Sequence, residues 1–148
     1  MPEHLNKIES ACKTCYSYSK PCNYFVRDVA IAAGIQLPSY GSADDLIRTV
    51  ASQWRNLSAQ EAVTAACNGV FVIAGMTSTE LHESHGHVAI VLSGQLNGFP
   101  RVAATNEGTR RSGKSDGSTP LTRVFPAALV RAGRVRFFGK PAGSTGSW

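Results

Sequence analysis

The stretch VFVIAGMTSTELHESHGHVAIVLSG, residues 70–94, decides the fold class of this chain. It begins with a short run of β-branched and aromatic residues, 70–75, and ends with a second such run, 86–94. Short apolar runs of this kind predict buried strands. The polar residues between the two runs, 76–85, predict a surface loop.

The chain after residue 94 predicts more of the sheet. Asn97-Gly98 is typical of a tight hairpin turn, so residues 101–105 are expected to pair with the strand before them. Residues 106–120, NEGTRRSGKSDGSTP, are rich in Gly, Ser and charge and predict a mobile surface loop. Residues 120–132 favour no single element, and the alternation in RVRFFG, 134–139, predicts a last strand.

The chain before residue 70 has helical patterns. Helices are expected at about 5–13, at 22–34 with Gly34 as its stop, at 42–54, and from the capping box Ser58-Ala59-Gln60-Glu61 to Asn68-Gly69. Helices first and an antiparallel sheet afterwards predict an α+β fold.

Length and composition set the class of protein. The chain has 148 residues, 43% of them hydrophobic and 17% charged, which predicts a single globular domain over residues 1–148 and excludes a disordered chain. No apolar run is long enough for a membrane span, and the first residues, MPEHLNKIES, lack the features of a secretory signal. We therefore expect a soluble protein made in the cytoplasm, without a membrane partner.

The charge is uneven along the chain. Residues 1–100 carry a net charge of −2, whereas residues 101–140 carry +7. The basic last third predicts either an anionic partner, such as an acidic cell-wall polymer, or simply a solvated basic face. It lacks the interleaved aromatic residues of single-strand binders, so nucleic acid is not expected as a partner.

Cys22 and His87 are the candidate catalytic pair. Cys22 stands at the expected start of a helix, where the positive end of the helix dipole would lower the thiol pKa. His87 opens the strand His-Val-Ala-Ile-Val-Leu, and a Cys opening a helix with a His opening a later strand is what papain-like chemistry requires. The alternatives are a buried structural cysteine and a half-exposed histidine at a strand end.

The other candidate groups are weaker. Cys12-x-x-Cys15 with His85-x-His87 has zinc-ligand chemistry, but a structural thiol pair is favoured. His82, Glu83 and His85 either rim a cleft or are solvated. Trp54 and Cys67 are expected to pack in the core. No metal and no cofactor are expected.

Three ordered motifs carry a resemblance: Cys-x-x-Phe-Val at Cys22, Val-Ile-Ala-Gly at 72–75, and Gly-His-Val-Ala at 86–89. Over roughly residues 8–138 the chain resembles the type VI secretion amidase effectors of family one, which are NlpC/P60-like, papain-fold peptidoglycan endopeptidases. The resemblance implies that Cys22 is the nucleophile and His87 its base. It also implies cleavage between γ-D-glutamate and meso-diaminopimelate in the peptidoglycan stem peptide.

The group that orients His87 is less clear. The segment after the hairpin offers no obvious side chain before Thr105, so a backbone carbonyl near Ala104 is the expected partner, with Thr105 or Asn106 as alternatives. Pro21 and Asn23 flank Cys22 where the family pattern has other residues, although proline suits a helix entry.

The resemblance further implies partners and a location. These are a type VI apparatus that exports the protein into the periplasm of a neighbouring Gram-negative cell, and a cognate periplasmic immunity protein. A monomer is expected. Two rival functions stay open: a papain-fold acyltransferase with the same Cys22 and His87, and a non-enzymatic zinc- or nucleic-acid-binding module that would not need Cys22.

Overall fold

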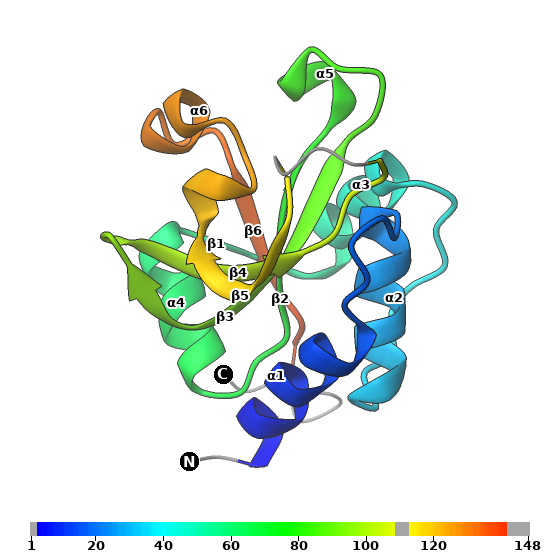
Figure 1. Cartoon of the computed structure of the whole chain (residues 1–148), viewed down its shortest axis with the longest axis vertical. Helices are drawn as coiled ribbons and strands as arrows, with labels where there is room; N and C mark the ends of the chain where they lie inside the picture. The colour runs from blue at the N-terminus through cyan, green and yellow to red at the C-terminus, as the bar shows by residue number, and fades with distance from the viewer. Residues whose placement is uncertain (1–2, 109–112, 142–148) are drawn as a thin grey trace.

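The fold is α+β, as predicted. The computed structural model describes residues 3–108 and 113–141, in which one antiparallel sheet of six strands has the order β1-β6-β2-β3-β4-β5 and carries helices on both faces (Figure 1). The helices are α1 (Glu3–Cys15), α2 (Cys22–Ala32), α3 (Ala43–Gln53), α4 (Ala59–Cys67), α5 (Ser78–Leu81), the 3-10 helix η1 (Leu121–Arg123) and α6 (Ala127–Arg131). The strands are β1 (Arg55–Leu57), β2 (Val72–Met76), β3 (His87–Leu96), β4 (Phe99–Ala104), β5 (Ser115–Pro120) and β6 (Arg136–Gly139).

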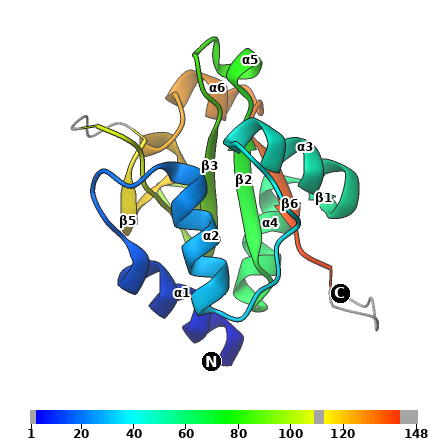
Figure 2. The same ribbon diagram turned by 90° about the vertical axis from the view of Figure 1, so that its right-hand side faces the viewer.

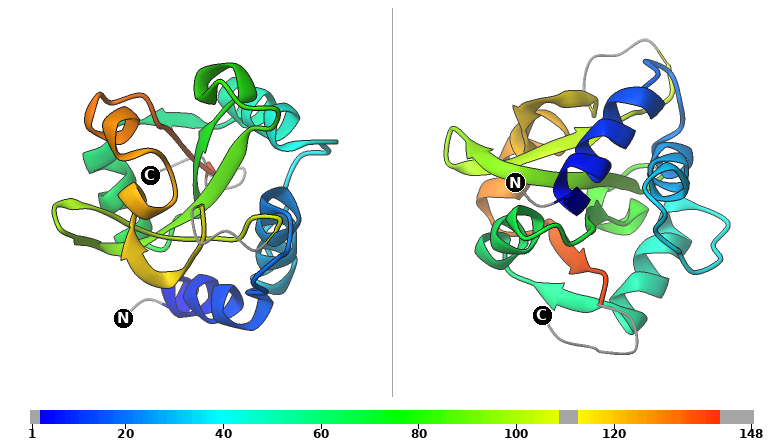
Figure 3. Two further views of the ribbon diagram at one scale, coloured as in Figure 1. Left: turned by 45° about the horizontal axis from the view of Figure 1, so that its top comes forward. Right: turned by 90° about the horizontal axis from the view of Figure 1, so that it is seen from below.

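Alternation along β3 divides the core into two layers. Val88 and Ile90 face the layer formed with α1, α2 and α3, whereas Ala89 and Val91 face the layer formed with α4 and the η1 segment. All four side chains are fully or almost fully buried. The two sets of helices lie on opposite sides of the strands in Figures 2 and 3.

The predicted hairpin is confirmed, but the prediction of a loop after it is partly wrong. Asn97 and Gly98 have φ values of 54° and 82°, the left-handed conformation that the tight turn between β3 and β4 requires. Within the predicted loop, Ser115–Pro120 forms β5 and pairs with β4. Backbone pairing at the sheet edge, with the Ser115 hydroxyl donating to the Val102 carbonyl at 2.7 Å, outweighs the weak strand propensity of this segment. Residues 109–112 of that loop lie outside the described residues.

The last predicted strand is confirmed as β6, in a place that its sequence does not reveal. It lies between β1 and β2, so the last strand in sequence is an interior strand, next to the edge strand β1. Its partner β1 is only three residues long and follows α3 directly, which explains why no strand pattern predicted it.

The expected loop at 76–85 contains a short helix, α5. The sequence holds its signal, because Thr77 and Glu80 form a reciprocal capping box like the confirmed one of Ser58 and Glu61 in α4. In Figure 1, α5 and α6 rise beyond the end of the sheet at which α2 begins. None of the helices in the described ranges is long and apolar enough to cross a membrane.

Candidate active site

Cys22 is the first residue of α2, as predicted, and its position is fixed from two directions. Pro21 is the N-cap, and its carbonyl accepts the N–H groups of Tyr24 and Phe25 at 3.1 Å and the Thr105 hydroxyl at 3.4 Å. Phe25 is fully buried in the core below. The start of the helix is therefore anchored both to the sheet and to the segment after β4.

The sulfur of Cys22 lies against the backbone at the start of β3. Its Sγ is 4.0 Å from the carbonyl oxygen of Gly86, and the backbone N–H groups of Val88, Asn23 and Cys22 itself act on it. Burial raises the pKa of this thiol to about 11, although those N–H groups act to lower it. The expectation of a lowered thiol pKa is therefore wrong, because the loss of hydration outweighs the helix start.

His87 is the first residue of β3 and is 6% exposed. Its Nε2 donates to the carbonyl oxygen of Gly113 at 2.8 Å, which leaves Nδ1 of the neutral ring as the nitrogen that can accept a proton. The Phe125 ring packs edgewise on the imidazole with 5.4 Å between centroids. Burial lowers the pKa of His87 to about 4, so the resting ring is neutral.

The carbonyl that contacts His87 belongs to Gly113, so the expected carbonyl, that of Ala104, is the wrong one. Ala104 instead lies opposite Ser115 in the ladder of β4 and β5, and the alternative Thr105 reaches Pro21. Gly113 has a φ of +81°, and a Cβ there would lie 3.3 Å from Nε2 of His87. No side-chain pattern could have indicated this residue, because it acts through its backbone, 26 positions beyond His87.

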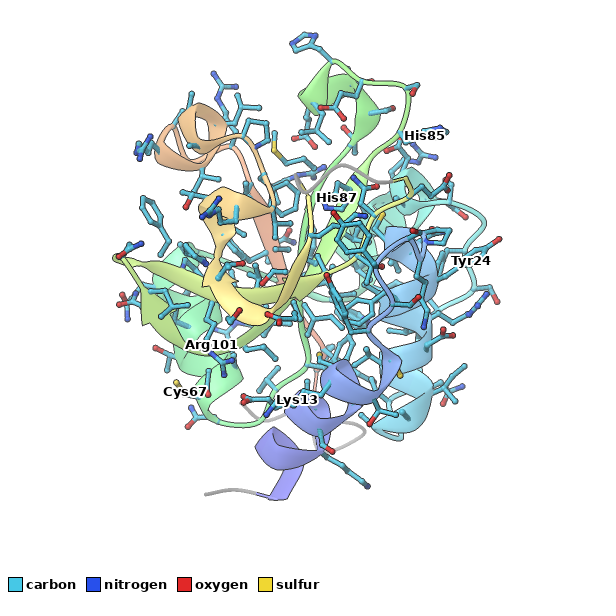
Figure 4. The ribbon with its side chains drawn as sticks, in the orientation of Figure 1. Lys13, Tyr24, Cys67, His85, His87 and Arg101 are labelled. Carbon is cyan, nitrogen blue, oxygen red and sulfur yellow. The ribbon has the colours of Figure 1, made fainter. Side chains whose placement is uncertain are left out.

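Cys22 and His87 line two adjoining hollows at one end of the sheet. A hollow of about 500 Å³ is lined by Cys22, and a second of about 330 Å³ is lined by His87. The residues that line both are Ser84, His85, Gly86 and Asn106. In Figure 4, His87 lies near the base of the α5 segment, with His85 and Tyr24 on one side of it.

The segment that carries His87 is tied to α3 by a carboxylate. Asp44 accepts the backbone N–H of Ser78 at 2.8 Å and its hydroxyl at 2.5 Å, which joins α5 to the start of α3. A Cβ at Gly86 would collide with Oδ1 of Asp44 and lie 3.0 Å from the Met76 carbonyl. A glycine beside His87 therefore allows the strand to pass close to this carboxylate.

The remaining predicted residues divide between cleft, core and surface. His85 and Glu83 line the hollows and are exposed, whereas His82 is exposed at the end of α5. Trp54 is in the core, as predicted, but Cys67 is exposed at the end of α4, so the expectation that it packs is wrong.

Cys12 and Cys15 do not form a metal centre with the histidines. Both are free thiols of α1, Cys12 packed in the core and Cys15 half-buried. Among the described residues, no three His, Cys, Asp or Glu side chains are grouped so that they could hold a metal ion. The zinc-binding alternative therefore has no support in this part of the chain.

The buried imidazole predicts a loss of stability in acid. The pKa of His87 is about 4 in the folded chain, whereas an ordinary histidine, as in the unfolded chain, has a pKa of 6.5. Between these two pH values, His87 therefore binds a proton only in the unfolded chain. As the pH falls through that window, the free energy of unfolding of the wild type should fall by about 3 kcal/mol more than that of His87→Asn. Urea unfolding at several pH values measures this difference. His82→Asn, a change at an exposed left-handed residue that asparagine tolerates, should keep the wild-type dependence.

The chain is similar to a known protein over part of its length. No protein-family model matches the chain. The chain is 34% identical over 98 residues to the peptidoglycan amidase Tse1 of Pseudomonas aeruginosa, and the match spans 60% of this chain and 60% of the length of that protein. A thiol that opens a helix packed on an antiparallel sheet, with an imidazole opening the adjacent strand, is also the papain-like arrangement that the resemblance implied. The resemblance found from the three motifs is thus confirmed, and over that stretch the chain is similar to a peptidoglycan amidase.

Proposed function

We propose that this protein is a cysteine peptidoglycan amidase that hydrolyses the bond between γ-D-glutamate and meso-diaminopimelate in stem peptides. The observation that carries the proposal is the meeting of Cys22 Sγ with the backbone on both sides of His87, at a cleft. The similarity to a peptidoglycan amidase supports the substrate class. The bond itself follows from the family resemblance.

The neutral resting pair sets the order of the steps. Because both pKa shifts favour the uncharged forms, Cys22 gives its proton to Nδ1 of His87 as its sulfur attacks the γ-carbonyl carbon. Backbone N–H groups at the start of α2 stabilise the oxyanion. The Gly113 carbonyl holds Nε2–H and steadies the imidazolium that forms.

The second half of the reaction returns the enzyme to its resting state. The imidazolium of His87 protonates the departing nitrogen of diaminopimelate, the C–N bond breaks, and Cys22 is left as a γ-glutamyl thioester. Water then gives a proton to His87 and attacks the thioester carbon. The thiolate leaves and recovers its proton from His87, so no proton is gained or lost by the enzyme.

The test of this proposal distinguishes hydrolysis from acyl transfer. A purified tetrapeptide stem is incubated with the protein in water enriched in oxygen-18, with and without an added amine, and the products are identified by mass spectrometry. Hydrolysis predicts one heavy oxygen in the new glutamate γ-carboxylate. A γ-glutamyl amide of the added amine as the main product would instead favour the acyltransferase alternative.

We further propose that the protein acts as an antibacterial effector, delivered by a type VI apparatus into the periplasm of a recipient Gram-negative cell and neutralised in the producer by an immunity protein. The family resemblance supports this route. The protein directed to the periplasm of a Gram-negative host should lyse it, whereas the same protein kept in the cytoplasm should not. Equal growth in the two cases would contradict the proposed site of action.

A further inference from the structure

The two hollows of the site differ in charge. The hollow that Cys22 lines has the acidic residues Asp44 and Glu107 in its wall and, among the residues that the structure describes, no lysine or arginine. The hollow that His87 lines has one arginine in its described wall, Arg123, together with Glu83. In the described walls of the two hollows, the arginine therefore lies on the imidazole side.

Arg123 is held through its backbone at a fixed place relative to the imidazole. Its backbone carbonyl accepts the N–H of Gly113 at 3.3 Å, and the carbonyl of Gly113 accepts Nε2–H of His87 at 2.8 Å. Two residues further along the chain, the Phe125 ring packs on the same imidazole. One short segment thus packs on the base and also places Arg123 in the wall of the hollow that the base lines.

The guanidinium of Arg123 is available to a ligand. Its side chain is exposed, and it forms none of the ion pairs found among the described residues. Two other arginines of the basic last third are already paired, Arg101 with Glu9 and Arg136 with Glu80. A free guanidinium at a cleft is suited to a carboxylate, which it binds through two parallel hydrogen bonds.

The roles of Cys22 and His87 in the reaction determine which part of the substrate enters the hollow that His87 lines. The acyl carbon is attacked by Cys22, whereas the departing nitrogen must come within reach of the imidazole that protonates it. The leaving group therefore extends into the hollow that His87 lines. A charged group bound there is on the amine side of the broken bond.

We infer that Arg123 is a specificity residue that binds a carboxylate of the leaving group. Glu83, in the wall of the same hollow, would face an ammonium of that leaving group. The inference rests on the proposed function. The side chain of diaminopimelate ends in a carbon that carries both an ammonium and a carboxylate. The side chain of lysine ends in an ammonium alone. The site should therefore prefer stems with diaminopimelate to stems with lysine.

The experiment compares two synthetic tetrapeptide stems, one with meso-diaminopimelate and one with L-lysine at the third position. The wild type should hydrolyse the diaminopimelate stem with a kcat/KM about tenfold higher, and Arg123→Gln should remove that preference. The loss should appear in KM with kcat nearly unchanged, because the ion pair forms with bound substrate as well as in the transition state. Arg134→Gln, an exposed arginine outside both hollows, should keep the wild-type preference.

The outcomes separate this inference from the function on which it rests. Equal hydrolysis of both stems by the wild type, or an Arg123→Gln variant that keeps the preference, would overturn the role of Arg123 and leave the amidase proposal standing. Hydrolysis of neither stem by folded wild type would overturn the amidase proposal and, with it, this inference.

Discussion

Cys22→Ala is expected to lower kcat/KM for a peptidoglycan stem peptide at least about 10⁴-fold, because no attacking sulfur and no thioester remain. The variant should fold, since alanine fits the apolar cluster that surrounds this residue. Circular dichroism and a thermal melt check the fold, and a timed assay of the released peptide gives the rate. Cys67→Ala, a change at an exposed free thiol, is the matched control and should retain wild-type activity.

A Cys22→Ala variant with more than about a hundredth of wild-type activity would show that the thiol is not the nucleophile. The hydrolysis would then use a directly activated water, and the geometry around Cys22 would be structural.

His87→Asn is expected to lower kcat/KM about 10³-fold at neutral pH, because the variant lacks both the base that takes the thiol proton and the acid that serves the leaving nitrogen. Substrate binding should change much less, since the ring is only 6% exposed and offers little surface to a ligand. The loss should therefore appear in kcat. His82→Asn is the control, as in the stability measurement.

The pH profile of the same variant gives a second signature. In the wild type, a thiol pKa of about 11 and an imidazole pKa of about 4 keep the pair neutral over the neutral range, so kcat/KM should be flat there. Without the base, the reaction depends on the small fraction of free thiolate, and the residual rate should rise about tenfold per pH unit. A flat residual profile in His87→Asn would contradict the role of His87 as the base.

Much of the fold could be predicted because its signals are local. The capping box at Ser58, the positive-φ pair Asn97-Gly98 and the helix stop at Gly34 depend on neighbouring residues alone. The place of β6 in the sheet and the pairing of β5 depend on partners far along the chain, so periodicity could not show them. The capping box of Thr77 and Glu80 is also a local signal, so α5 could have been predicted as well.

The candidate site divides in the same way. Cys22 and His87 could be singled out because a nucleophile and its base need particular side chains at the start of a helix and of a strand. The partner of His87 could not, because the Gly113 carbonyl is a backbone group that any residue possesses. The thiol pKa was predicted in the wrong direction, because burial depends on the whole packing around Cys22.

The role of Cys22 and the bond that is cut are tested together by digesting purified Gram-negative sacculi with the wild type and with Cys22→Ala and identifying the released fragments by mass spectrometry. We expect stem peptides cut after γ-D-glutamate in the wild-type digest and intact stems with Cys22→Ala. Intact stems in both digests, or the same cut in both, would contradict the assignment of Cys22 as the nucleophile of an amidase.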